Sequence, residues 1–311
     1  MAGRLRLGYA CINMTLQKEQ GLTCNRGMIR RTFIEKGIEY AGELALRNCR
    51  DIIPIMKWNA ENDIFVWRLS SEIFPWMSEY EFDDLPNIDE IRAVLREVGE
   101  LSKKLGVRLS FHPGPFNVLA SPHERVVAKT IKELNQHSEI FNMMGFEPSP
   151  ENKVNIHIRA TYGDKQGTGD RFIANFDRLA DHTKKRLTLE NDDKASQWSV
   201  VDLMRIHEAT GVPIVFDYHH HRFCDGGLSE EDALKLAATT WPKETVQVVH
   251  YSESCTLLKD NGKPKMPQAH SQYIEGPILN YGLDIDCVIE AKQKELTLLN
   301  YRGEKKCMKV T

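Results

Sequence analysis

The feature that most constrains the fold of this chain is a regular alternation between short β-branched segments and longer segments of helical periodicity. The predicted strands cover 4–9, 64–69, 107–112, 153–158, 186–190, 213–217, 246–251 and 286–290. Alternating strands and helices imply parallel strands joined by right-handed crossovers. Eight such units in 311 residues predict an α/β fold, the (β/α)8 TIM barrel. A doubly wound sheet is the alternative, but the Gly-x-Gly-x-x-Gly turn that usually opens one is absent from the sequence.

Capping residues and glycines predict where several helices begin and end. The predicted helices cover 29–56, 88–105, 124–144, 199–210 and 229–240. Ser121 and Pro122 have the pattern of an N-cap followed by a first-turn proline. Gly106, Gly145 and Gly211 follow three of these segments and are expected to stop them. Because no linker or repeat interrupts the pattern, we expect one domain over 1–302 and a C-terminal tail over 303–311.

Composition limits the location and the partners of the protein. The formal charge of −3 argues against a generally basic surface for nucleic acid, although a local basic patch remains compatible with it. The seven cysteines form no CxxC pair, which indicates free thiols in a reducing compartment. No apolar run approaches the ~20 residues of a membrane helix, and the strand-like start has no leader pattern. We therefore expect an intracellular protein without membrane contact.

Polar residues follow most of the predicted strands, at the barrel face that carries active sites. The strand ends read His112, His157, Glu190, Asp217, His250 and Glu290. Three histidines at 219–221 follow the sixth strand, and His270 follows the seventh. Each position taken alone is as compatible with a hydrogen-bonded or helix-capping role as with a functional one. Six such positions on one rim are harder to explain by coincidence.

Imidazole and carboxylate groups without cysteine favour Zn²⁺, Mn²⁺ or Fe²⁺. The set is larger than one ion requires, so it predicts two or three divalent cations. Glu190, in the middle of the set, could bridge two of them. Cations about 3.5–4 Å apart stabilise both the attacking and the leaving oxygen in phosphoryl transfer. No GxSxG motif for a protein nucleophile is present.

Several segments, in one order along nearly the whole chain, carry a family resemblance. They are 7–9 (LGY), 25–26 (NR), 111–114 (FHPG), 162–165 (YGDK), 189–192 (LEND), Asp217-x-x-His220-His221, His250 and 289–292 (IEAK). With these segments the chain resembles the UV damage endonucleases, which are barrel nucleases related to endonuclease IV. The HPG tripeptide alone is weak, whereas the whole set is fairly specific.

The resemblance implies hydrolysis of DNA immediately 5′ to a pyrimidine dimer or a 6-4 photoproduct, leaving a 3′-hydroxyl. It also implies a divalent metal cluster, usually of manganese, with zinc or magnesium as alternatives. The implied ligands are Glu79, His112, His157, Glu190, Asp217, His220, His250, His270 and Glu290. One ion would take Glu190, Asp217, His250 and Glu290; a second would take His112 and His157 and share Glu190; a third would use His220 and His270.

Further residues are expected to act on the DNA itself. Lys165 and Tyr9 would position the strand beside Glu190. The implied contacts to DNA or to the lesion are Asn13, Arg26, Pro115, Phe116, Tyr162 and Lys259. Basic residues of predicted loops, Arg159 and Arg171 among them, could follow phosphates, although loops are commonly charged.

The chain departs from the family pattern at three places. Glu79 stands where the family usually has histidine, and Val248 stands where a lysine often precedes the strand-seven histidine by two residues. Pro115 and Phe116 stand where a glutamine and an aromatic residue usually follow HPG, and these side chains are thought to wedge into the duplex. Phe116 can still wedge or stack, whereas Pro115 has no group to bond an orphaned base.

Three other functions remain open from the sequence, and one of them is an endonuclease that cleaves DNA only at abasic sites. A sugar isomerase of the xylose-isomerase type uses the same barrel and the same kinds of ligand. A lesion-binding protein that keeps metal but has lost turnover is the third possibility, motivated by Glu79, Pro115 and Val248. We prefer the nuclease, because binding to a lesion alone would not require the carboxylates of Glu190, Asp217 and Glu290. We expect a monomer that binds damaged double-stranded DNA in the cytoplasm, at the nucleoid of a prokaryote or in the nucleus of a eukaryote.

Overall fold

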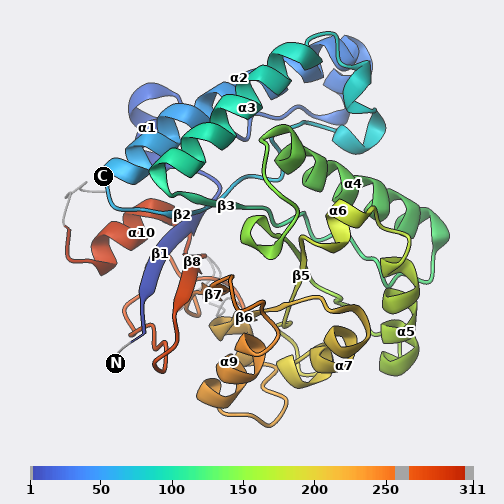
Figure 1. Ribbon diagram of the computed structural model, residues 1–311, viewed down its shortest axis with the longest axis vertical. Coiled ribbons are helices and arrows are strands. Elements are labelled where there is room, and N and C mark those ends of the chain that lie inside the picture. Colours follow the sequence, from blue (N-terminus) through green and yellow to red (C-terminus); the bar gives the residue numbers. More distant parts are fainter. Residues whose placement is uncertain (1–2, 256–265, 305–311) are drawn as a thin grey trace, which may run out of the picture.

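Eight parallel strands form the centre of the molecule (Figure 1). The computed structural model describes residues 3–255 and 266–304. The strands are β1 (Leu5–Ala10), β2 (Val66–Arg68), β3 (Arg108–Ser110), β4 (Val154–Ile156), β5 (Leu187–Glu190), β6 (Ile214–Asp217), β7 (Gln247–Tyr251) and β8 (Ile285–Ile289). Each of them overlaps one predicted strand, and most are shorter by one to three residues at an end.

The sheet closes on itself. Neighbours follow the order β3-β2-β1-β8-β7-β6-β5-β4, so the first and last strands of the chain pair in the middle of this series. A parallel bridge between Phe111, just after β3, and Val154 of β4 joins its two edges. The backbone N–H of Phe111 donates to Lys153 O at 2.9 Å, and that of Asn155 donates to Phe111 O at 2.9 Å. The predicted (β/α)8 barrel is confirmed.

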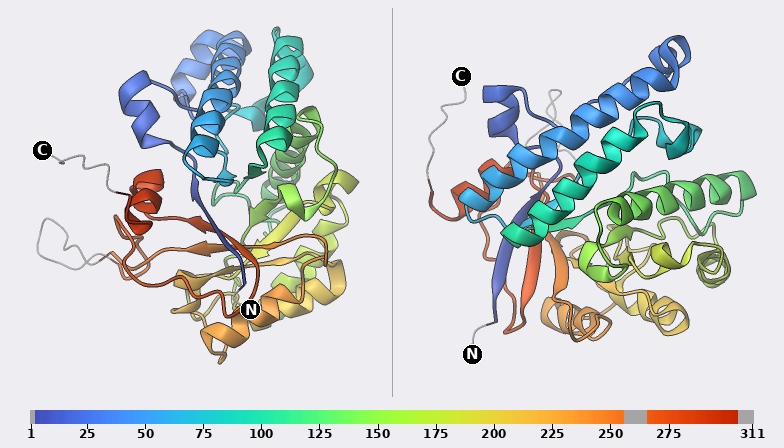
Figure 2. Two further views of the ribbon diagram at one scale, coloured as in Figure 1. Left: turned by 60° about the vertical axis from the view of Figure 1, so that its left-hand side comes forward. Right: turned by 45° about the horizontal axis from the view of Figure 1, so that its top comes forward.

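Helices cover the outside of the barrel (Figure 2). They are α1 (Met14–Gln20), α2 (Arg30–Glu61), α3 (Ile88–Leu105), α4 (Glu124–Met143), α5 (Lys165–Phe176), α6 (Asp181–Lys184), α7 (Val200–Thr210), α8 (Tyr218–His221), α9 (Glu230–Ala238) and α10 (Lys294–Tyr301). Three 3-10 turns are η1 (Met77–Glu79), η2 (Phe82–Asp84) and η3 (Pro150–Asn152). Between β7 and β8 no helix occurs in the described residues 252–255 and 266–284.

Most predicted helix ends agree with the structure. α3 and α7 end at Gly106 and Gly211, both at positive φ, which glycine adopts without a Cβ clash. The N-cap prediction at Ser121 is wrong. His123 occupies the cap of α4 without a side-chain cap bond, and Ser121 Oγ instead accepts from the backbone N–H of His123 at 3.1 Å. The serine thus closes a turn one step before the helix.

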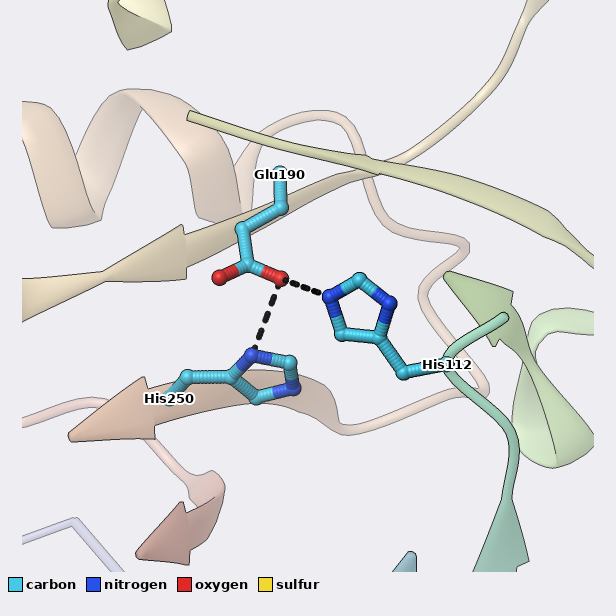
Figure 3. Close-up of side chains that lie close together, drawn as sticks. All are labelled: His112, Glu190 and His250. Atoms are coloured by element: carbon cyan, nitrogen blue, oxygen red, sulfur yellow. Dashed lines mark ion pairs between the residues drawn. The ribbon is translucent and has the colours of Figure 1, made fainter. Parts of the chain in front are cut away.

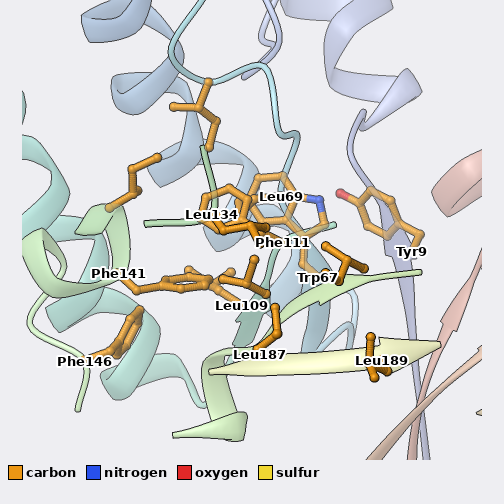
Figure 4. Packing of buried hydrophobic residues seen from close by; sticks show 14 of the residues in the cluster. Tyr9, Trp67, Leu69, Leu109, Phe111, Leu134, Phe141, Phe146, Leu187 and Leu189 are labelled. Atoms are coloured by element: carbon orange, nitrogen blue, oxygen red, sulfur yellow. The ribbon is translucent and has the colours of Figure 1, made fainter. Parts of the chain in front are cut away.

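Side chains alternate between two apolar layers along the strands, as a period of two requires. The larger cluster lies between strands and helices and includes Tyr9, Trp67 and Phe111 (Figure 4). A small cluster lies on the other face of the strands, inside the barrel, and includes Val66 and Val248. The inner layer therefore fills the barrel beneath the strand ends.

A buried ion pair lies at the opposite end of the barrel, where the strands begin. Arg108 Nη1 lies 2.9 Å from Asp286 Oδ2, and both side chains are almost fully buried. Arg108 also donates to the backbone oxygens of Pro150, Glu151 and Val246. These bonds leave the guanidinium well satisfied without water.

None of the helices in the described part of the chain is both long and apolar enough to cross a membrane. Of the predicted tail over 303–311, residues 305–311 lie outside the described residues.

Candidate metal centre

The carboxyl ends of β3 to β8 bring imidazoles and carboxylates together around Glu190, the last residue of β5. Glu190 Oε2 lies 3.0 Å from His250 Nδ1 and 3.2 Å from His112 Nε2 (Figure 3). The same oxygen lies 3.7 Å from His157 Nε2, and Oε1 lies 3.3 Å from His220 Nδ1. The Glu190 side chain is about 1% exposed. One buried carboxylate thus faces four imidazoles.

A second carboxylate group forms the next part of the site. Glu290 Oε1 lies 3.2 Å from His250 Nδ1, and Oε2 lies 3.8 Å from His270 Nε2. Arg68 Nη1, at the end of β2, makes a short ion pair with Glu290 Oε1. Asp217, at the end of β6, completes a triad with His250 and Glu290. The carboxylate of the last strand is therefore shared between histidines and an arginine.

The potential ligand atoms fall into three overlapping triads. They are His112, Glu190 and His250; His157, Glu190 and His220; and Asp217, His250 and Glu290, with atoms of each triad within 4.8 Å of one another. The third triad contains three of the four residues predicted for one ion, without Glu190. The second differs from it, because the triad of His157 contains His220 in place of His112. His270 lies at the edge and belongs to no triad within the described residues.

Orphaned polar atoms show that these residues fit a cation. Glu190 Oε1, Asp217 Oδ2 and His250 Nδ1 are buried and make no hydrogen bond within the described structure. Buried polar atoms are nearly always hydrogen-bonded, so such a group needs another partner. The chemistry of the set, neutral imidazoles with carboxylates, suits Mn²⁺ or Zn²⁺.

Hydrogen bonds from neighbouring side chains orient the potential ligands. Asn155, two residues before His157 on β4, donates to Glu190 Oε2. The backbone of Asp217 is fixed by Asn191, whose Oδ1 accepts from the Asp217 N–H at 2.8 Å. Ser252 Oγ lies 2.6 Å from His270 Nδ1. Such contacts restrict ring and carboxylate orientation, which is what a preformed metal site requires.

Burial and the cluster itself shift the pKa values. Burial lowers the pKa of His112 to about 3 and raises the pKa of Asp217 to about 7. Burial opposes ionisation of Glu190, but His250 and its other imidazole neighbours outweigh it and hold the pKa of Glu190 well below its usual range. Burial also lowers the pKa of His220, but Asp217 and Glu190 outweigh it and raise the pKa to about 9.

The raised pKa of His220 predicts that metal affinity depends on pH. A ligating imidazole must be neutral, so His220 has to release a proton when a cation binds. The affinity for Mn²⁺ is therefore expected to rise as the pH increases towards about 9, and binding should release protons. Calorimetric titration in two buffers of different ionisation enthalpy measures both. An affinity that is constant between mildly acidic and alkaline pH would contradict this assignment of His220.

A buried lysine lies beside the cluster and was not predicted. Lys153 is fully buried, and its Nζ lies 3.4 Å from His250 Nε2. Burial lowers the pKa of Lys153 to about 7. Lys153 and Asn155 are two positions apart and so share the inward face of β4. In this chain the inner lysine comes from β4, while Val248 on β7 packs in the inner apolar cluster.

The structure does not bring Lys165 and Tyr9 to the site. Lys165 begins α5, and its Nζ pairs with Asp202 at 2.6 Å. Tyr9 is fully buried on the outward face of β1 and donates a hydrogen bond to Asn59 Oδ1 at 2.8 Å. The expected role of Tyr9 in holding DNA is wrong, because its hydroxyl lies in the core beneath the helices.

Two of the expected DNA contacts are also structural. Asn13 is fully buried, caps α1 and donates to the Tyr9 hydroxyl. Its expected contact with DNA is therefore wrong. Arg26 Nη2 pairs with Asp51 at 2.6 Å and donates to the backbone of Gly21. Arg26 therefore fixes the loop before α2.

Other predicted residues lie on the mouth of the barrel. Phe116 is 89% exposed and Tyr162 is 45% exposed. Pro115 lines the pocket above the cluster. Glu79 is half-exposed and pairs with Lys129 at 3.2 Å, so the structure does not place it in the three triads. Lys259 lies outside the described residues.

Only one histidine of the triplet reaches the cluster. His220 joins it, whereas His219 Nε2 lies 3.1 Å from the backbone oxygen of Gln268, and His221 packs against Phe216. The pocket above the cluster has a volume of about 330 Å³. Arg68 and Arg159 line it together with several of the imidazoles. Asp192, Asp193 and Glu290 belong to the same lining, so both positive and negative groups lie beside the candidate cation sites.

Comparisons with known proteins identify the family of the chain. The UV-endonuclease UvdE family matches residues 5–309. The UV-damage endonuclease of Schizosaccharomyces pombe is 35% identical over 302 residues, which cover 94% of this chain and 49% of the relative. The chain spans about half the length of the curated fungal relatives that it matches.

Solved structures agree with the fold. The crystal structure of SacUVDE has a TM-score of 0.81 and 29% sequence identity, and the match covers 97% of this chain and 100% of that chain. Endonuclease IV from Thermus thermophilus shares the barrel, with a TM-score of 0.53, 13% identity and coverage of 96% of this chain and 98% of that one. The match over almost the whole sequence shows that the chain belongs to the UV-endonuclease UvdE family.

Proposed function

We propose that this chain is a metal-dependent DNA repair endonuclease that hydrolyses the phosphodiester bond 5′ to UV photolesions and leaves a 3′-hydroxyl. The observation that carries the proposal is the buried Glu190 carboxylate within 3.7 Å of four imidazole nitrogens. The family assignment and the names of the relatives support the same substrate. Manganese is the first candidate ion, with zinc or magnesium as alternatives.

The proposed ligands are those that converge in the structure. They are His112, His157, Glu190, Asp217, His220, His250 and Glu290, with His270 at the edge. Two or three divalent cations held there would polarise the phosphate and stabilise both the attacking and the leaving oxygen. Asn155 and Arg68 orient the carboxylates of Glu190 and Glu290. The guanidinium of Arg159, which lines the pocket, supplies a charge for the phosphate.

The mouth of the barrel supplies the contacts with DNA. Phe116 projects into solvent next to Pro115, and its exposure supports a role in wedging between bases, as apolar side chains do where a duplex is kinked. Tyr162 lies beneath the guanidinium of Arg171, whose carbon is 5.5 Å from the ring centroid. We assign these residues to damaged double-stranded DNA, bound by a monomer whose domain covers 1–302. A DNA substrate would place the protein at the nucleoid or in the nucleus.

A plasmid assay tests the proposed function. With Mn²⁺, the purified protein is expected to convert UV-irradiated supercoiled plasmid to the nicked circle, and chelation by EDTA should abolish the conversion. Unirradiated plasmid is the control. A labelled oligonucleotide with one thymine dimer locates the cut, which is expected on the 5′ side of the dimer. Tight binding to the irradiated plasmid without nicking would replace this proposal with a lesion-binding function, and ketose–aldose interconversion would replace it with a sugar isomerase.

A further inference from the structure

A second hollow, which we call the side groove, lies next to the metal pocket. Its volume is about 990 Å³, three times that of the metal pocket. Its walls are the loop after β2 (71–79), the loop after β3 (114–118) and the first half of α4 (125–133). The two hollows share Gly114 and Pro115 in their linings. The loop that carries Phe116 is therefore a partition between them.

One wall of the side groove is a fixed aromatic surface. Trp76 has a positive φ of 59°, and its indole Nε1 donates to Met28 O at 2.9 Å. Its ring stacks on Phe33, with centroids 5.9 Å apart and planes at 18°. The exposed ring of Phe116 lines the same groove. The held ring of Trp76 and the exposed ring of Phe116 offer stacking surfaces to unpaired bases.

A carboxylate lies on the α4 side of the groove. Glu133 Oε1 accepts from Asn117 Nδ2 at 2.7 Å, and Asn117 is buried. Glu72 lines the groove as well, and burial together with Glu133 raises the pKa of Glu72. A carboxylate only accepts hydrogen bonds, so its suitable partner on a base is an exocyclic amino group.

Charge decides which part of a nucleotide fits. Arg30 and Arg125 are exposed residues of the groove lining and suit phosphates, whereas Lys129 is paired with Glu79 in the same lining. The carboxylates repel phosphates and accept amino groups. The combination of aromatic walls, a carboxylate and exposed cations matches a nucleotide whose base points inward.

The position of the Phe116 loop also bears on which strand of the DNA duplex the side groove would face. The strand to be cut must place its phosphate over the metal pocket. In the proposed function Phe116 wedges between the two strands of the duplex, so the hollow on the far side of its loop would face the uncut strand. The uncut strand carries the bases that lose their partners when a photolesion leaves the stack.

We propose that the side groove binds an unpaired adenine or cytosine of the strand opposite the lesion, with Glu133 accepting from its exocyclic amino group. This inference rests on the proposed function, and it gives the chain a means of recognising the orphaned base that Pro115 cannot supply. Adenine is the common case, because it stands opposite thymine dimers.

A base-substitution experiment tests the groove. Two duplexes carry the same thymine dimer and differ only opposite it, with adenine in one and purine, which lacks the amino group, in the other. Fluorescence anisotropy without added metal measures binding while the duplex stays intact. The wild-type protein is expected to bind the adenine duplex roughly tenfold more tightly or better, as a hydrogen bond to a charged group allows. Single-turnover nicking with Mn²⁺ should show the same preference.

Protein variants show whether a binding preference comes from the side groove or from the different stabilities of the two duplexes. Glu133→Gln keeps an oxygen for the Asn117 bond and replaces the other with a donor, so it should bind both duplexes equally. Glu72→Gln is the second variant should Glu133→Gln fail to fold, and it should reduce the preference. Glu208→Gln makes the same change at an exposed position of α7 and should keep the wild-type ratio.

The outcomes are distinguishable. Equal wild-type affinity for the adenine and purine duplexes overturns the groove inference alone. Absence of any preference for dimer-containing over intact DNA, together with absence of nicking, overturns the proposed function and the inference with it. If Glu133→Gln and Glu72→Gln both keep the preference for the adenine duplex over the purine duplex, another residue accepts from the amino group. This result also overturns the inference.

Discussion

Replacing Glu190 with glutamine is expected to reduce nicking of irradiated plasmid by more than the roughly 10–100-fold that loss of a contact orienting a metal ligand costs. The physical reason is that Glu190 belongs to two of the three triads and lies within 3.7 Å of four imidazoles. A neutral amide removes the negative charge that would balance the proposed cations, and it is a weaker ligand. The measurement is the single-turnover rate with saturating Mn²⁺, together with the metal content of the purified variant.

The matched control is Glu208→Gln, on the exposed side of α7, which should nick at the wild-type rate. Circular dichroism and the melting temperature establish that both variants fold. A folded Glu190→Gln protein with an unchanged rate and full metal content would remove this carboxylate from the site and leave the proposed mechanism without its centre.

Replacing Asp286 with alanine is expected to lower the free energy of unfolding by about 3–5 kcal/mol, the cost of leaving a buried charge without its partner. Asp286 is fully buried, and it accepts from both Arg108 and Arg6. Its loss leaves the Arg108 guanidinium, whose side chain is 2% exposed, with only the half-exposed Glu151 carboxylate, 3.4 Å away, as an acidic partner. Urea unfolding followed by tryptophan fluorescence gives the difference, provided that the slopes remain equal.

Two comparisons accompany this prediction. Glu124→Ala removes an ion pair with Arg178 on the surface and should leave the unfolding midpoint close to that of the wild type, since exposed pairs contribute little. The double variant Arg108→Met with Asp286→Leu should recover much of the loss, because it removes both charges. A single Asp286→Ala variant as stable as the wild type would show that Glu151 and the backbone oxygens around Arg108 compensate its charge.

The strands and the ligand positions could be predicted from the sequence, because both follow from the pattern of neighbouring residues along each strand. A period of two and the polar residue at each strand end predicted that His112, Glu190, Asp217 and His250 would share one rim, and the structure brings them together. No tertiary information is needed for that step, since the carboxyl ends of barrel strands all face one side.

Other roles depend on partners that are far away in sequence. Tyr9 is expected at the mouth, yet it lies between β1 and the helices, because the inward positions of β1 are those of its neighbours Gly8 and Ala10. Lys165 and Arg26 have the composition of phosphate contacts, but Asp202 and Asp51 are their partners. A sequence does not show which of its many acidic side chains will form an ion pair with a given basic side chain.

The residues that were missed share one physical trait. Arg68, Lys153 and Asn155 are buried or partly buried polar groups on or next to strands, and each contacts a ligand of the cluster. In a sequence they read as ordinary polar residues, although inward parity on β4 could have pointed to Lys153 and Asn155. Their position four and two residues before His157 was the available signal.

The candidate ligands come from β3 through β8, so they are complete only when the closing strands of the barrel are paired. A cation bound there would hold together segments from His112 to Glu290 and would oppose every motion that opens the ring. Any ligand bound only by the closed form raises its stability with concentration. Proteolysis of the metal-loaded protein should therefore begin outside this span, and no fragment cut within it would retain the whole set.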